Sequence, residues 1–417
     1  MINCMNKNLK YFLLVIFTFL YIYYPPIFPI NVHHLLAGIS WFVILSNYNK
    51  ISRIFKSIRF DKEVVFLVIL SIYLYFVLIF NNGSDIIIGY PYIRILTHVI
   101  PIGVVIVYWF SKNHSDKNFL VFIVHVGLLQ SVISILALLN PSFQNWIIES
   151  MLAYGFDDII EKLSVYRLYG MSYTMAYSMP IVQGIIASIA VYLSINKKFK
   201  YIFFVPFIIV SGAINARISI VIFLIGLSYI LFNQFIQVRQ GKKIVGLIIV
   251  VSLIFIFYIP LSNILNTISP STYLWINEGF DQIFSLFSGE IEGYFTYLFD
   301  PEKFILPNNI QRIFGTSYKV IRNYEFYQSD IGFVNDIWKG GIIYSIVVYS
   351  YLFLKTLSIS NISKSFKSLL VIHILLILIA SNLKGTIFGT NEFINIFYLF
   401  FIYVNYSGIK NVSTKKG

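Results

Sequence analysis

Charged residues are scarce in this chain of 417 residues: Asp, Glu, Lys and Arg make up 12% of it, roughly half the fraction found in soluble globular proteins. Cysteine is scarcer still, because Cys4 is the only one, and this excludes an intrachain disulfide, a Cys-ligated zinc site and an iron–sulfur cluster. Hydrophobic residues make up 58% of the sequence and the mean hydropathy is +0.78, which excludes intrinsic disorder. The composition predicts an integral membrane protein, in which the net charge of +13 reflects loop placement rather than nucleic-acid binding.

Long apolar runs predict an all-α polytopic membrane protein with about 12 transmembrane helices. A helix needs about 20 mostly apolar residues to cross a bilayer, because each backbone N–H and C=O must find its partner inside the segment. This criterion gives spans at residues 11–29, 33–47, 64–81, 93–110, 119–139, 174–195, 200–213, 217–235, 244–264, 340–357, 368–383 and 388–405. The first run ends at Pro25-Pro26 without a small-residue cleavage site, so we expect a retained helix rather than a signal peptide. A turn at 211–217, with its Gly, Asn and Arg, is predicted to separate the seventh and eighth spans.

The distribution of basic residues predicts the orientation of these spans, because Lys and Arg accumulate in the cytoplasmic loops of membrane proteins. If the amino terminus is cytoplasmic, the cytoplasmic segments hold 21 of the 31 basic residues but only three of the 18 acidic ones, Asp61, Glu63 and Asp116. We therefore expect both termini in the cytoplasm and the chain in the bacterial cytoplasmic (inner) membrane.

The spans divide the chain into membrane regions and two long external loops. The predicted regions are 1–139 with helices 1–5, the loop 140–173, 174–264 with helices 6–9, the loop 265–339, and 340–417 with helices 10–12 and a cytoplasmic tail. The two loops hold 13 of the 15 remaining acidic residues. In the second loop, apolar residues recur every three or four positions over 273–287, which predicts a helix on the outer membrane surface. A lid that serves only packing is the alternative interpretation of this loop.

Neither loop contains a histidine, since the six histidines lie at positions 33, 34, 98, 114, 125 and 373. A histidine catalyst on the external face is therefore not expected. The nearest paired carboxylates, Asp157-Asp158 and Glu290-x-Glu292, lack a further ligand, and we interpret them as solvated charge rather than a metal site. Because no glycine-rich phosphate motif is present either, we predict no metal, nucleotide or other cofactor.

Ten basic residues lie on the predicted external side, against the bias that orients the chain. They are Arg94, Lys162, Arg167, Arg217, Lys303, Arg312, Lys319, Arg322, Lys339 and Lys384. Arginine binds phosphate through a planar pair of donors and lysine adds a point charge, so a cluster of them can hold a pyrophosphate. Contact with a lipid headgroup or an acidic side chain is the alternative for each one. Arg167 and Arg217 stand out because each lies where a helix is about to enter the membrane, and a charge at that depth is costly.

The end of the second loop, residues 328–341, carries two candidate carboxylates. Asp330 lies among apolar and aromatic residues, where a carboxylate can act as a base on a sugar hydroxyl. Asp336 can do the same, but we expect it to cap the amino terminus of the tenth helix.

With these motifs, the chain resembles the O-antigen and capsular polysaccharide polymerases of the Wzy class, which are related to the O-antigen ligases. Arg167-x-x-Gly170 ends the first loop and Asn215-x-Arg217 forms a turn two helices later. The second loop contains Ile313-Phe314-Gly315, Ser329-Asp330-Ile331-Gly332 and the helix start Gly340-Gly341. The ligases place a histidine in their long loop, so the absence of one between 265 and 339 argues against a ligase.

The resemblance implies a metal-independent integral-membrane glycosyltransferase that works at the outer face of the membrane. Its implied partners are an undecaprenyl-pyrophosphate-linked oligosaccharide, membrane lipid and a chain-length regulator protein, and nucleic acid is not among them. In this interpretation Asp330 and Arg217 are catalytic, and the pyrophosphate and glycan are bound by Arg167, Gly170, Arg312, Arg322 and Lys384.

Two other classes of membrane protein remain as alternatives. A lipid-linked oligosaccharide flippase or transporter also contacts pyrophosphate through cations, but it should place them inside the helices along a two-sided cavity and have short loops. An O-antigen ligase shares the helix plan and differs in its histidine. Long acidic loops with basic residues on one side only favour the polymerase.

Overall fold

The structure is a computed structural model. It describes residues 6–27, 30–83, 86–115, 117–153, 167, 169–236, 262–263, 265–288, 296, 300–317, 329, 331–360, 382, 385–386, 388–389 and 391–413. The chain forms two compact units, of which unit 1 comprises Met1–Leu35 and Trp109–Phe284, and unit 2 comprises Leu36–Tyr108 and Ser285–Gly417. The described residues form helices and no strand, which confirms the predicted all-α class.

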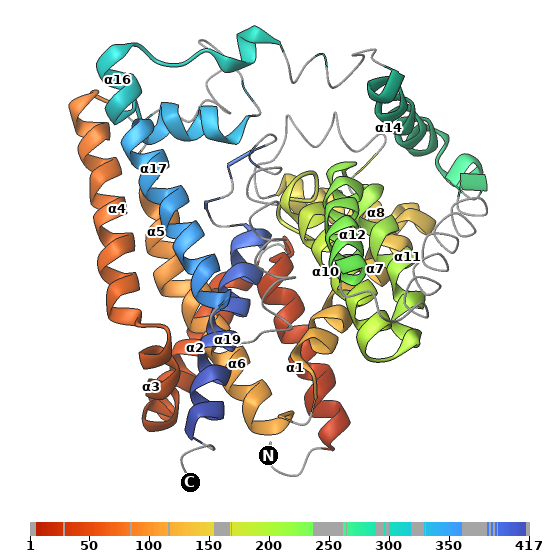
Figure 1. Cartoon of the computed structure of the whole chain (residues 1–417), viewed down its shortest axis with the longest axis horizontal. Coiled ribbons are helices and arrows are strands. Elements are labelled where there is room, and N and C mark those ends of the chain that lie inside the picture. The colour runs from red at the N-terminus through yellow and green to blue at the C-terminus, as the bar shows by residue number, and fades with distance from the viewer. Residues whose placement is uncertain are drawn as a thin grey trace. The chain divides into compact units, whose positions relative to one another are not determined.

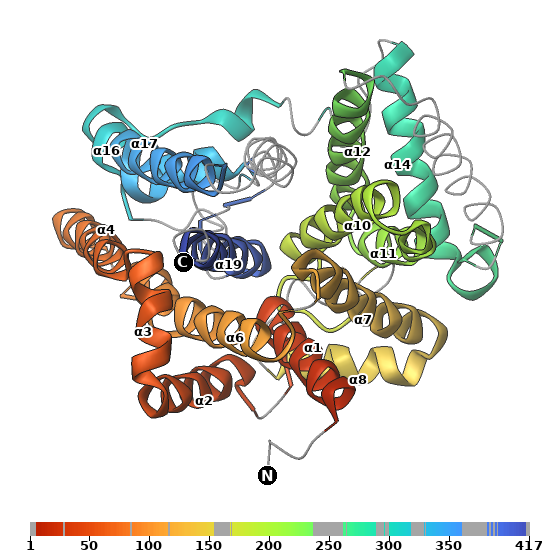
Figure 2. The ribbon, with the colours of Figure 1, turned by 60° about the horizontal axis from the view of Figure 1, so that its bottom comes forward.

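Unit 1 is a helical bundle built around α10 (Ser178–Asn196). Its other elements are α1 (Lys7–Tyr23), α7 (Phe119–Leu139), α8 (Pro141–Leu152), the short 3₁₀ helix η3 (Phe199–Phe204), α11 (Val205–Ala213), α12 (Ile218–Ile236) and α14 (Pro270–Ser288). Helix α10 packs against α7, α11 and α12, which lie around it in both views (Figures 1 and 2). Nearly all of α10 is buried. Gly184 allows this close packing, because a Cβ there would lie 2.6 Å from the backbone oxygen of Ser219 in α12.

The helix ends in unit 1 follow from local sequence. Asn118 caps α7, since its side chain accepts a hydrogen bond from the Leu120 amide at 2.8 Å. Asn140 ends α7 and caps α8, whose first residue is Pro141. Helix α1 ends at Tyr23 with Tyr24 in the left-handed conformation, directly before two prolines. The first predicted span, 11–29, is therefore too long at its carboxyl end.

Unit 2 contains the remaining helices. They are α2 (Val32–Ser46), which begins in unit 1, α3 (Tyr48–Ser57), α4 (Phe60–Phe80), α5 (Tyr90–Arg94), the π-helical turn η2 (Ile95–Val99), α6 (Ile100–Asn113), which ends in unit 1, η4 (Pro301–Phe304), α16 (Asn309–Phe314), α17 (Gly332–Ser360) and α19 (Glu392–Ser413). Helix α17 packs against α4, α16 and α19. Helix α16 lies beside the first part of α17 (Figure 1).

Helix α17 bends at Gly341, whose φ of 78° lies in the left-handed region. Gly315, at the end of α16 with a φ of 89°, packs against Gly340, because a Cβ on Gly315 would lie 2.6 Å from backbone atoms of Gly340. Thr316 completes the contact, because its amide donates to the Trp338 carbonyl at 2.8 Å. Two motifs of the second predicted loop, Ile313-Phe314-Gly315 and Gly340-Gly341, therefore form a single packing contact.

Five described helices are long and apolar enough to cross a membrane: Phe60–Phe80, Tyr90–Asn113, Phe119–Leu139, Ser178–Asn196 and Gly332–Ser358. Three shorter apolar helices lie at Val32–Ser46, Phe199–Ala213 and Ile218–Ile230. These helices support a membrane protein, but the count of 12 spans is not confirmed. The predicted spans at 244–264 and 368–383 lie almost entirely outside the described residues.

The structure decides three expectations about individual segments. The turn expected between the seventh and eighth spans is present, because α11 ends at Ala213 and α12 begins at Ile218. The expected amphipathic helix over 273–287 is also present as α14. By contrast, the tenth helix begins at Gly332 rather than at 340, so the end of the predicted loop 265–339 is helical.

Candidate functional site

Asn215 joins the two arginine-bearing segments of unit 1. Its side-chain oxygen accepts a hydrogen bond from the Tyr169 amide at 2.8 Å, and its nitrogen donates to the Tyr169 carbonyl at 2.6 Å. The same nitrogen donates to the Ser211 carbonyl at 2.8 Å, which fixes the side chain at the end of α11. Because Asn215 is fully buried, these bonds form away from solvent. The segment with Arg167 is thus held against the turn with Arg217.

Arg167 and Arg217 lie against the same aromatic ring. The guanidinium carbon of Arg217 is 4.8 Å from the centre of the Trp275 indole, and that of Arg167 is 5.8 Å from it. Trp275 lies on α14 and supplies the electron-rich face that attracts cations. Two of the predicted site residues therefore meet in space at a third residue that the motifs did not include.

The end groups of Arg217 contact α14. One terminal nitrogen donates to the Gln282 side-chain oxygen at 2.9 Å, and the other donates to the Trp275 carbonyl and to the Glu278 carboxylate at 3.1 Å. Gly279 allows this contact, because a side chain there would overlap the Arg217 side chain. The side chain of Glu278 is 62% exposed and that of Arg217 is 22% exposed, so water screens the ion pair.

Tyr169 and Gly170 give the Arg167-x-x-Gly170 motif at the end of the first loop a structural role. The Tyr169 hydroxyl forms hydrogen bonds with Thr272 at 3.0 Å and Ser269 at 3.2 Å, at the amino terminus of α14. Gly170 has a φ of 129°, a conformation that other residues rarely adopt. A Cβ on Gly170 would lie 2.6 Å from polar atoms of both Gln130 and Ser134. Gly170 therefore positions the arginine segment and leaves room for α7.

The carboxylate of Asp336 in unit 2 does not cap a helix, and that expectation was wrong. Helix α17 begins four residues earlier, at Gly332, so Asp336 lies within it. The buried carboxylate accepts a hydrogen bond from the Tyr349 hydroxyl at 2.6 Å. One turn on, the Lys339 ammonium donates to the Tyr92 hydroxyl at 2.8 Å.

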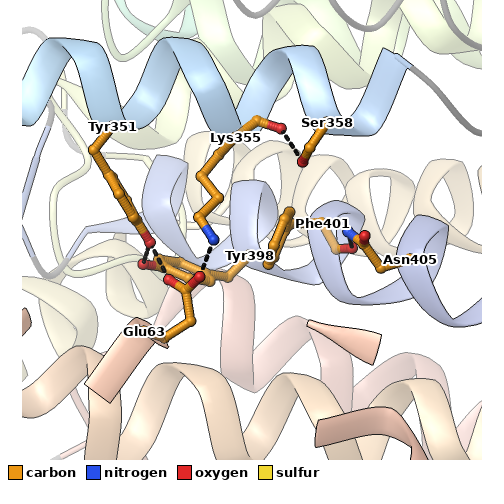
Figure 3. Close-up of polar contacts among 7 residues, drawn as sticks. All are labelled: Glu63, Tyr351, Lys355, Ser358, Tyr398, Phe401 and Asn405. Atoms are coloured by element: carbon orange, nitrogen blue, oxygen red, sulfur yellow. Dashed lines mark hydrogen bonds and ion pairs between the residues drawn. The ribbon is translucent and has the colours of Figure 1, made fainter. Parts of the chain in front are cut away.

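A side-chain cluster around a buried ion pair joins three helices of unit 2 (Figure 3). Glu63 on α4 is fully buried, accepts a hydrogen bond from Tyr351 on α17 and pairs with Lys355 one turn further along. The Tyr351 hydroxyl also contacts that of Tyr398 on α19 at 2.7 Å, and the Phe401 ring lies 4.6 Å from the ammonium of Lys355. This cluster binds α4, α17 and α19 together, and we interpret it as structural because every charge has a partner.

The other predicted site residues belong to unit 2 or lie outside the described residues. Arg312 lies in unit 2, where its Nε donates to the Pro307 carbonyl at 3.3 Å at the base of α16. Asp330, Arg322 and Lys384 lie outside the described residues. Among the described residues, no group of three His, Cys, Asp or Glu side chains is arranged to hold a metal ion.

Trp275, Tyr169 and the side chain of Asn215 are the members of the site that motif reasoning did not assign. The helical periodicity of 273–287 assigns Trp275 to the apolar face of an amphipathic helix, and this pattern does not predict that two arginines contact its ring. Asn215 carried a signal, since a polar side chain in a turn between two membrane helices requires a partner. Its partner, Tyr169, is 46 residues away along the chain.

Comparison of the chain with models of protein families, with curated proteins and with solved structures finds no match.

Proposed function

We propose that this protein is a polysaccharide polymerase, a membrane glycosyltransferase that joins undecaprenyl-pyrophosphate-linked oligosaccharide repeat units at the outer face of the bacterial cytoplasmic membrane. The observation that carries the proposal is the convergence of Arg167 and Arg217 on Trp275. Two guanidinium groups supply the charge and the paired N–H donors that a pyrophosphate needs. O-antigen or capsule is the proposed product.

The reaction is a glycosyl transfer between two lipid-linked glycans. A hydroxyl of the acceptor's terminal sugar attacks the anomeric carbon of the donor, and the bond from that carbon to the pyrophosphate oxygen breaks. Undecaprenyl pyrophosphate leaves with the electron pair, and Asp330 takes the proton of the attacking hydroxyl. Arg167 and Arg217 stabilise the charge that develops on the leaving group. Arg312, Arg322 and Lys384 are proposed as further contacts to the pyrophosphate or glycan.

Arg217 must exchange its partner on α14 for the pyrophosphate. The exposure of Glu278 places the ion pair in the class that contributes only about 0–1 kcal/mol. A pyrophosphate carries more charge than one carboxylate and can accept both ends of a guanidinium fork. The ion pair with Glu278 is therefore a weak competitor of the pyrophosphate, whereas the hydrogen bonds of Arg217 to Gln282 and to the Trp275 carbonyl must be replaced by bonds to the pyrophosphate oxygens.

Substitution of the arginines tests the proposal. Arg167→Ala and Arg217→Ala should abolish polymer while the protein remains in the membrane. Lys replacements should retain partial activity at best, because they keep the charge but lose the paired donors. The assay uses purified protein in lipid with a lipid-linked repeat unit, and polymer is scored as a ladder on a gel. A full ladder from both Ala variants would exclude this site.

The phenotype of a deletion separates the polymerase from the flippase and the ligase. Loss of a polymerase should leave single lipid-linked repeats on the outer leaflet, whereas loss of a flippase should trap them on the cytoplasmic leaflet. Loss of a ligase should leave long polymer on its lipid carrier. Gel analysis of surface glycan together with lipid extraction distinguishes these results, and long carrier-linked polymer would rule out the polymerase.

The proposed orientation has a separate test. Because Cys4 is the only native thiol, a Cys4→Ser background allows single cysteines at Ser164 and Ser288, in the two expected external loops. An impermeant maleimide should label both positions in intact spheroplasts. If both stay unlabelled until lysis, the site is not on the outer face.

A further inference from the structure

Unit 1 contains a group of buried polar side chains that have unused hydrogen-bonding capacity. This group, the inner polar layer, consists of Gln130 and Ser134 on α7, Gln183 on α10 and Ser219 on α12, and all four residues are fully buried. Five of their atoms have no hydrogen-bond partner in the described part of the chain: Gln130 Nε2 and Oε1, Ser134 Oγ, Gln183 Oε1 and Ser219 Oγ.

Glycines on the neighbouring segments make room for these side chains. Gln130 and Ser134 converge on Gly170, where each has a polar atom 2.6 Å from the position that a Cβ would take. At Gly212, near the end of α11, a Cβ would overlap the Ser219 hydroxyl oxygen, and the Cβ of Gln183 lies 3.1 Å from the position that it would take. The pair Gln130 and Ser134 is connected to the pair Gln183 and Ser219, because Gln183 Nε2 donates to the carbonyl of Gly127 at 3.3 Å. Gly127 lies one turn before Gln130 on α7.

Several other buried serines of the same bundle have partners, so a hydroxyl buried in this bundle does not generally lack one. Ser131 donates to a carbonyl of its own helix at 2.9 Å, Ser188 does so at 3.0 Å and Ser211 at 2.9 Å. A buried polar atom without a partner destabilises a fold, because it has lost its water and gained nothing. Five such atoms together are therefore expected where a polar ligand binds.

We infer that the inner polar layer binds hydroxyl groups of the sugar that is attached to the pyrophosphate. The inference rests on the proposed function and adds a sugar subsite to its arginine pair. A glutamine amide both donates and accepts, as does a serine hydroxyl, which suits neutral sugar hydroxyls better than an anion. Ser219 follows Arg217 by two residues, and Gly170, on which Gln130 and Ser134 converge, follows Arg167 by three, so the layer lies beside both arginine-bearing segments.

Binding measurements on the full chain in lipid nanodiscs test the inference with two probes. One probe is the lipid-linked repeat unit extracted from the deletion strain, and the other is undecaprenyl pyrophosphate. Gln130→Leu should weaken binding of the repeat unit at least tenfold and change binding of undecaprenyl pyrophosphate less than twofold. Arg217→Ala should weaken binding of both. Gln130→Leu should also unfold no more easily than the wild type, because it removes an amide that has no partner.

Variants that remove a single oxygen atom control for the possibility that Gln130→Leu fails to fold. Ser134→Ala and Ser219→Ala each remove one oxygen and should show the same selective loss, whereas Ser188→Ala, a buried serine bonded to its own helix, should bind as the wild type does. Equal binding of the repeat unit by the wild type and by all three layer variants would overturn the inference without affecting the proposed polymerase function. A wild type that binds no repeat unit would overturn both. If the layer variants selectively lose binding of the repeat unit but the wild type forms no polymer, the sugar subsite is supported and the proposed polymerase function is refuted.

Discussion

Replacement of Asn215 by leucine should separate the two arginine segments. The change removes both hydrogen bonds to Tyr169, of 2.6 and 2.8 Å, and leaves a buried N–H and a buried C=O without partners. Each such group costs about 1–3 kcal/mol, so Asn215→Leu should destabilise this contact by about 2–6 kcal/mol. Even the lower figure corresponds to roughly a thirtyfold shift toward the separated state.

Two assays measure this effect. The thermal midpoint of purified Asn215→Leu should fall by several degrees, and its polymer yield should fall at least tenfold. Asn196→Leu is the matched control, because Asn196 is exposed and its side chain donates to the Tyr192 carbonyl of its own helix at 3.0 Å. Its unfolding should stay within about 0.5 kcal/mol of the wild type.

A double mutant shows whether Asn215 acts through the arginine segment. In an Arg167→Ala background, Asn215→Leu should weaken pyrophosphate binding little further, because the group that it positions is already gone. Fully additive losses would show that Asn215 supports the site by another route. Wild-type unfolding together with a wild-type ladder from Asn215→Leu would refute the reasoning altogether.

Three further predictions concern neighbouring contacts. Gly170→Ala should cost about 1–3 kcal/mol and lower polymer yield, because the left-handed backbone and the close approach of α7 both oppose a Cβ, and thermal unfolding with the ladder assay measures this. Glu278→Gln should change stability by less than about 1 kcal/mol and lower the KM for the lipid-linked donor, because it releases Arg217 from an exposed ion pair; a raised KM would contradict this. Glu63→Met or Lys355→Met alone should destabilise unit 2 by about 3–5 kcal/mol, whereas the double replacement should be close to neutral. A double-mutant cycle of thermal unfolding measures this, and additive effects of the two replacements would contradict a buried ion pair.

Local sequence determined the helical class and several helix ends. Apolar runs indicate membrane helices because a bilayer leaves no other way to satisfy the backbone, and α4, α7 and α10 follow that rule. The break between α11 and α12 was predictable because Gly212, Asn215 and Arg217 interrupt an apolar run. The periodicity of α14 likewise predicted a helix, although the same pattern assigned Trp275 only to an apolar face.

Tertiary structure alone decided which polar groups meet. Arg167 and Arg217 are fifty positions apart, and their common contact with Trp275 depends on the rotation of α14 about its axis. Because α17 begins at Gly332, Asp336 lies inside the helix, where it is a buried partner of Tyr349 rather than the expected cap. Helical periodicity gives the spacing of side chains along one helix but carries no information on the register between helices, because that register is set by packing between surfaces distant in sequence.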